Sequence, residues 1–171
     1  MRALYTPFAA ICLMAAMPAT AADAPEIRRA PAAAQAIGAA HTLRTIPEAC
    51  ARLEGLFTGD AAAPYRFSAV RSSSNCQPRA RFVDATKAKP SVQAGWTLND
   101  VIRVPSAACP TQQAIVRVWR KAAAGAVPPK LDAQGQSRLY LQDAKAAAAR
   151  GAIAAVASYA AQLEVEGTAC R

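Results

Sequence analysis

Short runs in which apolar and polar residues alternate occupy the middle of the chain. A period of two places successive side chains on opposite faces of a strand, so each run predicts a β-strand that is buried on one side. The segments between the runs are rich in Pro, Gly, Ser and Asn, which are typical of turns. The pattern predicts four strands, at Tyr65–Val70, Arg79–Asp84, Asp100–Pro105 and Ala114–Lys121. A fifth candidate, at Arg138–Gln142, is either a short strand or the first turn of a following helix.

Apolar residues recur at helical spacing before and after these runs. Because a period of about 3.6 residues forms one apolar stripe, the first region predicts a helix over Pro47–Thr58, with proline in its opening turn. Asp143 is a suitable N-cap for a second, alanine-rich helix over Ala144–Val165. We therefore predict a single α+β domain over residues 45–171, in which two helices cover one face of an antiparallel sheet of four or five strands.

The N-terminal residues have the features of a secretory signal peptide. Arg2 supplies a positive charge, a mostly apolar run follows, and an A-x-A sequence ends at Ala21, so residues 1–22 are predicted to be removed on export. A membrane anchor is the alternative, but the run is shorter than the ~20 residues that cross a bilayer, and we expect no transmembrane segment in the mature chain. Residues 23–44 contain few bulky side chains and are predicted to be flexible. We expect a bacterial periplasmic or secreted protein.

Removal of the signal peptide would leave an even number of cysteines, which in an oxidising compartment predicts two disulfides. Zinc binding is disfavoured, because the cysteine spacings contain no C-x-x-C sequence and the chain holds one histidine. An antiparallel meander would bring the loops after its first and third strands to the same end of the sheet. Of the possible pairings, this arrangement favours Cys76–Cys109 and Cys50–Cys170.

The formal net charge is +9, and the excess lies in the predicted sheet region. Alternation assigns apolar side chains such as Phe82 and Val116 to the core and their neighbours to the opposite face. The candidate anion-binding or partner-binding residues are Arg66, Arg79, Arg81, Arg103, Arg117 and Trp119. Guanidinium groups beside an indole suit phosphate, carboxylate or sugar groups. The alternative is a solvated face that arginine stems simply cover.

Catalytic chemistry has little support in the sequence. The single histidine, His41, has no G-x-S-x-G sequence to accompany it, and no pair of carboxylates is marked by its surroundings. We predict no catalytic residue, no metal site and no cofactor, with a small hydrolase as the third alternative for the function.

A basic exported domain without catalytic signals suggests a binding protein. We expect its arginine-rich face to hold an acidic or polyanionic partner of the cell envelope, such as an acidic protein, anionic lipid, lipopolysaccharide or cell-wall polymer. Nucleic acid is disfavoured, because an exported protein rarely meets it. The second hypothesis is a secreted or periplasmic inhibitor or immunity-like protein that acts through its loops, at Trp96 and at residues 122–137.

Overall fold

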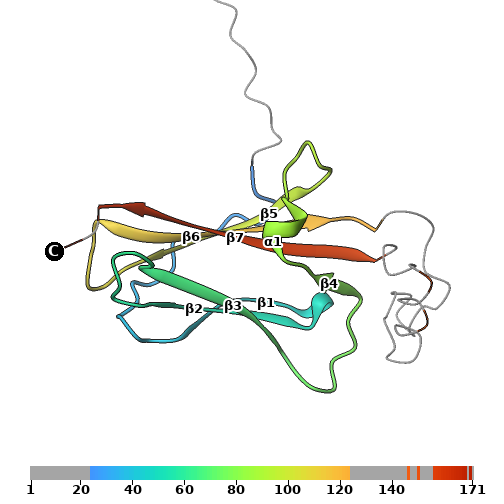
Figure 1. Ribbon diagram of the computed structural model, residues 1–171, viewed down its shortest axis with the longest axis horizontal. Helices are drawn as coiled ribbons and strands as arrows, with labels where there is room; N and C mark the ends of the chain where they lie inside the picture. The colour runs from blue at the N-terminus through green and yellow to red at the C-terminus, as the bar shows by residue number, and fades with distance from the viewer. Residues whose placement is uncertain (1–23, 124–145, 147–149, 151–155, 169, 171) are drawn as a thin grey trace, which may run out of the picture.

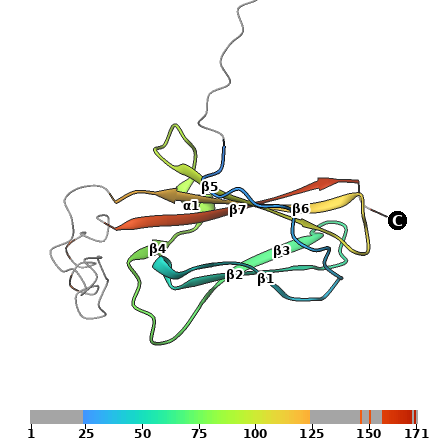
Figure 2. The same cartoon turned by 180° about the vertical axis from the view of Figure 1, so that it is seen from behind.

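Two β-sheets packed face to face form the described part of the chain (Figures 1 and 2). The structure, a computed structural model, describes residues 24–123, 146, 150, 156–168 and 170. The three-stranded sheet has the order β1 (His41–Ile46), β2 (Ala51–Phe57) and β3 (Tyr65–Arg71). The four-stranded sheet has the order β4 (Ala80–Phe82), β7 (Ala157–Gly167), β6 (Gln112–Lys121) and β5 (Thr97–Pro105). Two short helical segments, η2 and α1, span Pro47–Ala49 and Ala85–Ala88.

The predicted α+β fold class is wrong, because the described residues are mostly β, the first predicted helix does not form, and the described C-terminal part of the second is a strand. The helix expected over Pro47–Thr58 is replaced by the single turn of η2 and by β2. Cys50 has a φ of 50° and a ψ of 35°, a left-handed conformation that a helix cannot pass through. From Ala51 onward the alternate residues of β2 are buried, which is the period of a strand.

The C-terminal half of the second predicted helix, Ala144–Val165, is also a strand. Residues 157–165 lie in β7, which pairs with β6 along its whole length. Alanine favours a helix by intrinsic propensity, but propensity is weak compared with tertiary context, and burial and pairing with β6 outweigh it here. Most of residues 144–155 and the candidate strand Arg138–Gln142 lie outside the described residues.

The four strands predicted in the middle of the chain correspond to β3, β4, β5 and β6, but they do not form a meander. β3 belongs to the three-stranded sheet, where it pairs with β2. β4 pairs in parallel with β7, whereas β5 with β6 and β6 with β7 are antiparallel. The expected single sheet is therefore two sheets that cover each other, and sheet-on-sheet packing takes the place of the predicted helical cover.

The core lies between the two sheets and draws on every strand. Leu53 and Phe57 of β2 pack in the same cluster as Val104 and Val116 of the other sheet, and each of these side chains is almost completely buried. Phe82, expected in the core, packs against this cluster while remaining partly exposed. Such a core, made from the inner faces of two sheets, accounts for the alternation that the sequence displays.

Residues 24–38, which we call the N-terminal strap, run along the free side of β5. The backbone amides of Glu26, Ile27, Ala32 and Gln35 donate hydrogen bonds of 2.8–3.0 Å to carbonyl oxygens of β5. The strap therefore extends the four-stranded sheet at this side, although residues 23–44 were expected to be flexible. β1, which begins at His41, also lies within that range.

Two disulfides are present, as predicted, but they join Cys50 to Cys76 and Cys109 to Cys170. The favoured pairing, Cys76–Cys109 with Cys50–Cys170, is wrong because it assumed a meander. Gly167 of β7 lies opposite Gln112 of β6, and this register brings Cys170 to the turn that holds Cys109. The disulfides indicate an oxidising, extracytoplasmic environment. In the ranges that the structure describes, no helix has the length and apolar character to cross a membrane.

Candidate functional site

The side of the four-stranded sheet that points away from the three-stranded sheet is called the outer face here. Arg81 of β4 lies opposite Ser158 of β7, which in turn lies opposite Lys121 of β6. Alternation brings Arg103 of β5 and Arg117 and Trp119 of β6 to this face as well. The structure therefore brings together four of the six residues that the sequence marked as a binding face, namely Arg81, Arg103, Arg117 and Trp119.

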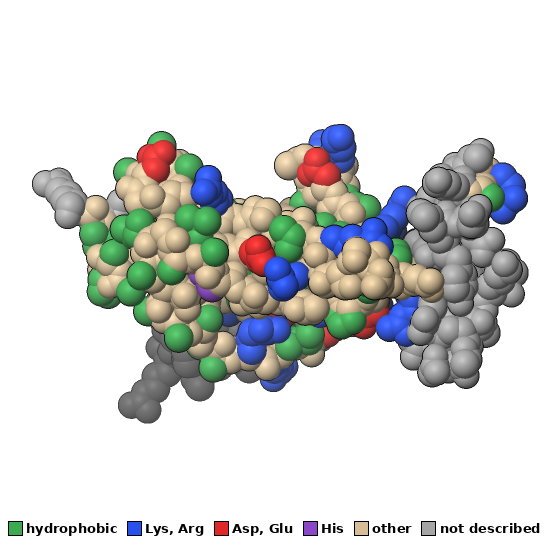
Figure 3. All heavy atoms as spheres, turned by 90° about the horizontal axis from the view of Figure 1, so that it is seen from below, with side chains coloured by type: hydrophobic (Ala, Val, Ile, Leu, Met, Phe, Trp, Pro, Cys, Tyr) green, Lys and Arg blue, Asp and Glu red, His purple; other side chains and the backbone are tan. Residues whose placement is uncertain are grey.

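The other two marked residues lie elsewhere. Arg66 is exposed on β3, in the three-stranded sheet, because that strand does not belong to the sheet the sequence predicted for it. Figure 3 views the molecule from the side of the three-stranded sheet, where acidic and basic side chains lie next to each other. Arg52 and Glu54 form one such pair, with 2.7 Å between Nε and Oε1. Arg79 precedes β4, and its backbone amide donates to the carbonyl of Glu48 at 2.7 Å.

The middle of the outer face carries less free charge than the sequence suggested. Arg117 forms an ion pair with Glu164, and the indole nitrogen of Trp119 donates to Gln162 Oε1 at 2.7 Å. Both partners come from β7, which was expected to be a helix on the opposite side of the sheet. Because β7 lies next to β6 instead, it places Glu164 and Glu166 at one end of the outer face. The sequence analysis missed these carboxylates for that reason.

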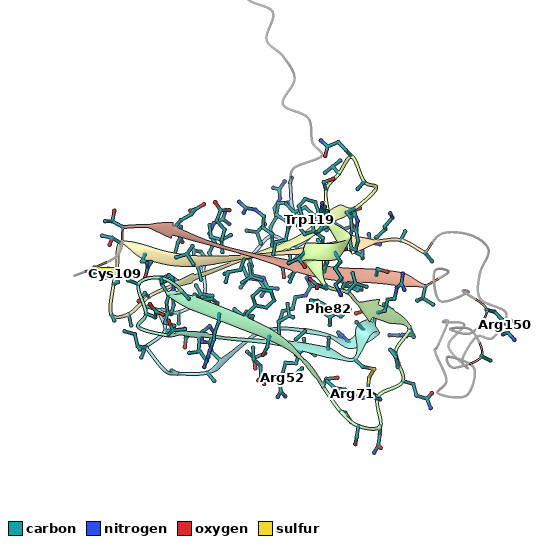
Figure 4. All side chains as sticks on the ribbon, viewed as in Figure 1. Arg52, Arg71, Phe82, Cys109, Trp119 and Arg150 are labelled. Atoms are coloured by element: carbon teal, nitrogen blue, oxygen red, sulfur yellow. A yellow bond between two sulfur atoms is a disulfide. The ribbon has the colours of Figure 1, made fainter. Side chains whose placement is uncertain are left out.

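The opposite end of the outer face is basic. We call Arg81, Ser158 and Lys121 the basic end. Arg81 and Lys121 are exposed, and Arg81 Nε donates to Ser158 Oγ at 3.2 Å. Their strands flank β7 on either side, so their backbones are about 10 Å apart at two strand spacings. Trp119 occupies the next row of the sheet (Figure 4).

Trp96 lies beside the basic end, next to Lys121. The ring is only 6% exposed, so it packs as a plug and offers no open contact surface. The ammonium of Lys121 lies 5.9 Å from the ring centroid, within the range of a cation–π interaction. The loop hypothesis named Trp96 together with residues 122–137, of which residues 124–137 lie outside the described residues.

A buried ionic cluster, which the sequence analysis missed, links the strap to both sheets. Asp100 of β5 is fully buried, and its carboxylate accepts hydrogen bonds from Arg29 Nη2 at 2.6 Å and Arg44 Nη1 at 3.1 Å. Arg29 belongs to the strap and Arg44 to β1, so one carboxylate holds three elements together. Asp100 has the same inward parity as Ile102 and Val104, and a carboxylate at an inward position requires a cation. The inward position of Asp100 in the alternating pattern was therefore the sequence signal that could have predicted this cluster.

Glu26 extends this cluster toward the end of the sandwich. It accepts from Arg120 Nη2 at 2.5 Å and from Asn99 Nδ2 at 2.6 Å. The hydrogen bond from Arg120, with smaller help from Asn99 and nearby positive charge, holds the pKa of Glu26 below its usual range. Burial raises the pKa of the neighbouring Tyr159 hydroxyl.

The side chains of His41, the single histidine, and of Asp84 have structural contacts. His41 Nε2 lies 2.8 Å from the hydroxyl of Tyr65, and its Nδ1 lies 3.1 Å from the carbonyl of Ala39. Asp84 caps α1 by accepting from the Thr86 amide at 2.8 Å. Within the described part of the chain, no three His, Cys, Asp or Glu side chains are grouped so that they could hold a metal ion.

Comparison of the chain with known protein families, with curated proteins and with solved structures finds no match. The function is therefore inferred from the surface of the protein itself.

Proposed function

We propose that the protein is exported to the bacterial periplasm or the medium and binds an acidic or polyanionic partner there without catalysing a reaction. Two disulfides and the signal-like sequence of residues 1–22 support the export. The formal net charge of +9 supports an anionic partner, because it attracts such partners over distances longer than a direct contact.

The basic end of the outer face carries the proposal. Arg81 and Lys121 flank Ser158 there, exposed and on the same side of the sheet, while Glu164 and Glu166 lie toward the other end. An anionic group bound between the two cations would accept charged hydrogen bonds from both. Binding at this end is favoured over the middle of the face, where Arg117 is already paired with Glu164.

The chemistry shared by the proposed partners is a phosphate or carboxylate group. Anionic lipid headgroups, lipopolysaccharide, cell-wall polymers and acidic proteins of the envelope all present such groups. A guanidinium binds them with a planar pair of donors, and an ammonium binds them as a compact charge. Trp119 offers an apolar surface beside the charges, which suits the sugar or alkyl part of an envelope molecule.

Salt-dependent binding of the mature chain tests the proposal. The probes are phosphatidylglycerol vesicles, soluble polyphosphate and polyglutamate, which separate lipid, phosphate and protein sources of the anionic group. The variant Arg81→Gln with Lys121→Gln should weaken binding to the preferred probe about 30-fold at low salt, at about 1 kcal/mol for each basic residue near an anionic surface.

The control variant removes the same number of positive charges, two, from the three-stranded sheet. Arg52→Gln with Arg66→Gln changes the outer side of the three-stranded sheet and should leave binding within about 2-fold of the wild type. Equal losses in the two double variants would mean that only net charge matters, and the basic end would then not be the binding site.

A further inference from the structure

Over much of its length, the β7 edge that faces β4 has no paired strand among the described residues, and α1 contacts β7 beside it. β4 pairs with β7 only through Tyr159, and among the described residues no strand pairs with this side of β7 beyond that point. The Val83 amide donates to the carbonyl of Tyr159, so Tyr159 directs its backbone groups toward β4. Because these groups alternate along an antiparallel strand, Ala161, Leu163 and Val165 direct theirs toward the open side.

A groove of about 730 Å³ runs beside this open edge. The apolar residues that line it are Phe67 of β3, Phe82 of β4, Val83, Ala85 of α1, and Ala161 and Leu163 of β7. Phe82 lies between the two sheets (Figure 4), and both phenylalanines pack against the core while remaining partly exposed. The edge thus combines backbone groups that can pair with a strand and an apolar surface that can receive alternate side chains of that strand.

The charge beside the open edge restricts what can bind. The side chains of β7 that face outward along it include Gln162, Glu164 and Glu166, so a strand added here would have its outward side chains directly across from two carboxylates. Arg117, which lies on the neighbouring strand β6, forms an ion pair with Glu164. A second copy of this chain would bring the same carboxylates toward its own, which is unfavourable.

We propose that the open β7 edge binds an extended segment of a partner protein in which apolar and basic residues alternate. The segment would add as a strand next to residues 161–167, with its apolar side chains on Phe67, Phe82 and Leu163. Its basic side chains would lie on the outer side, across from Glu164 and Glu166. This surface differs from the basic end in position and in the sign of the charge that it attracts.

Amide hydrogen exchange with a synthetic peptide tests strand addition directly. The probe is a peptide of alternating valine and lysine, as long as the open edge, and the comparison peptide alternates valine and glutamate. The lysine peptide should slow exchange of the Ala161, Leu163 and Val165 amides at least about tenfold. Binding of both peptides alike, binding without this protection, or no binding of the lysine peptide would overturn the proposal.

Three variants sharpen the test. Glu164→Gln with Glu166→Gln should weaken lysine-peptide binding about 2- to 30-fold, as expected for the loss of two exposed ion pairs. Glu54→Gln is the matched control, because Glu54 is also paired with an arginine on an outward sheet face, and it should leave the affinity unchanged. Val165→Pro removes a donor that points toward the open side and should abolish protection of the edge amides.

Sedimentation of the free protein identifies the competing occupant. A monomer that binds one lysine peptide agrees with the proposal. A dimer whose edge amides are already protected, and which Val165→Pro converts to monomers, would show that a second copy covers the edge and would overturn the proposal. Near-ultraviolet circular dichroism checks that each variant retains its fold. If Val165→Pro does not retain its fold, the charge variants still decide the test.

Discussion

The two long sides of the sandwich differ in whether the edge of the outer strand is paired. At the β5 side the strap adds backbone hydrogen bonds, and the buried Asp100 joins strap, β5 and β1 through two arginines. At the β7 side the described residues leave most of the strand edge unpaired, beside a partly apolar groove. An unpaired strand edge is a natural template for another chain. The comparison suggests that the protein closes one side internally and keeps the other for a partner.

The largest effect on the free energy of unfolding is expected from a substitution at the β5 side, which the strap closes. Asp100→Asn removes the charge that Arg29 and Arg44 share, and it leaves those cations without a counter-ion in a largely buried place. Loss of one partner from a buried ion pair costs about 3–5 kcal/mol, and we expect about 3 kcal/mol because the Arg29 side chain is 36% exposed. Urea denaturation of the oxidised protein measures the free energy of unfolding.

Asp60→Asn is the control for that experiment. Asp60 is exposed in the turn between β2 and β3, and its side-chain oxygen accepts from the Ala62 amide, a bond that asparagine can keep. We expect a change within about 0.5 kcal/mol. Similar losses for the two variants would mean that the buried cluster does not hold the strap to the sheets.

A smaller effect is expected from pH, through Glu26 on the same side. Its folded-state pKa is lowered, so the unfolded state binds a proton more readily, and the charged form stabilises the fold above the unfolded pKa. This contribution is lost as the pH falls from about 5 to about 3. The Glu26 side chain is 35% exposed, so solvent screens its charge and we expect less than about 1 kcal/mol.

The pH dependence is measured as the difference in unfolding free energy between the wild type and Glu26→Gln. The wild type should be the more stable at neutral pH, and the difference should shrink on acidification. A difference that stays constant from neutral pH down to about pH 3 would contradict the role of the Glu26 charge.

Alternation in the sequence was enough to predict four strands and part of the core. Phe82 and Val116 point inward as expected, because the period of two records which side of a strand is buried. The same rule predicted that Arg81, Arg103, Arg117 and Trp119 share a face. It could not assign a strand to a sheet, since pairing between distant segments leaves no mark in the local period, and so Arg66 was misplaced.

The errors of prediction come from long-range contacts. In β7 the alanines at 160 and 161 hide the alternation of Tyr159, Leu163 and Val165, and pairing with β6 decides the strand. The mistaken helix moved Glu164 away from Arg117, with which it forms an ion pair. In the first predicted helix, Pro47 does begin a turn, but the left-handed Cys50 beside its disulfide ends it.

Hydrogen exchange of the free protein tests the contrast between the two sides most directly. The strap amides of Ile27, Ala32 and Gln35 donate to β5, whereas those of Ala161, Leu163 and Val165 point toward the open side. We expect the strap amides to exchange at least about tenfold more slowly than the three amides of β7. Equal protection of both sets would contradict the account, because the β7 edge would then already be covered.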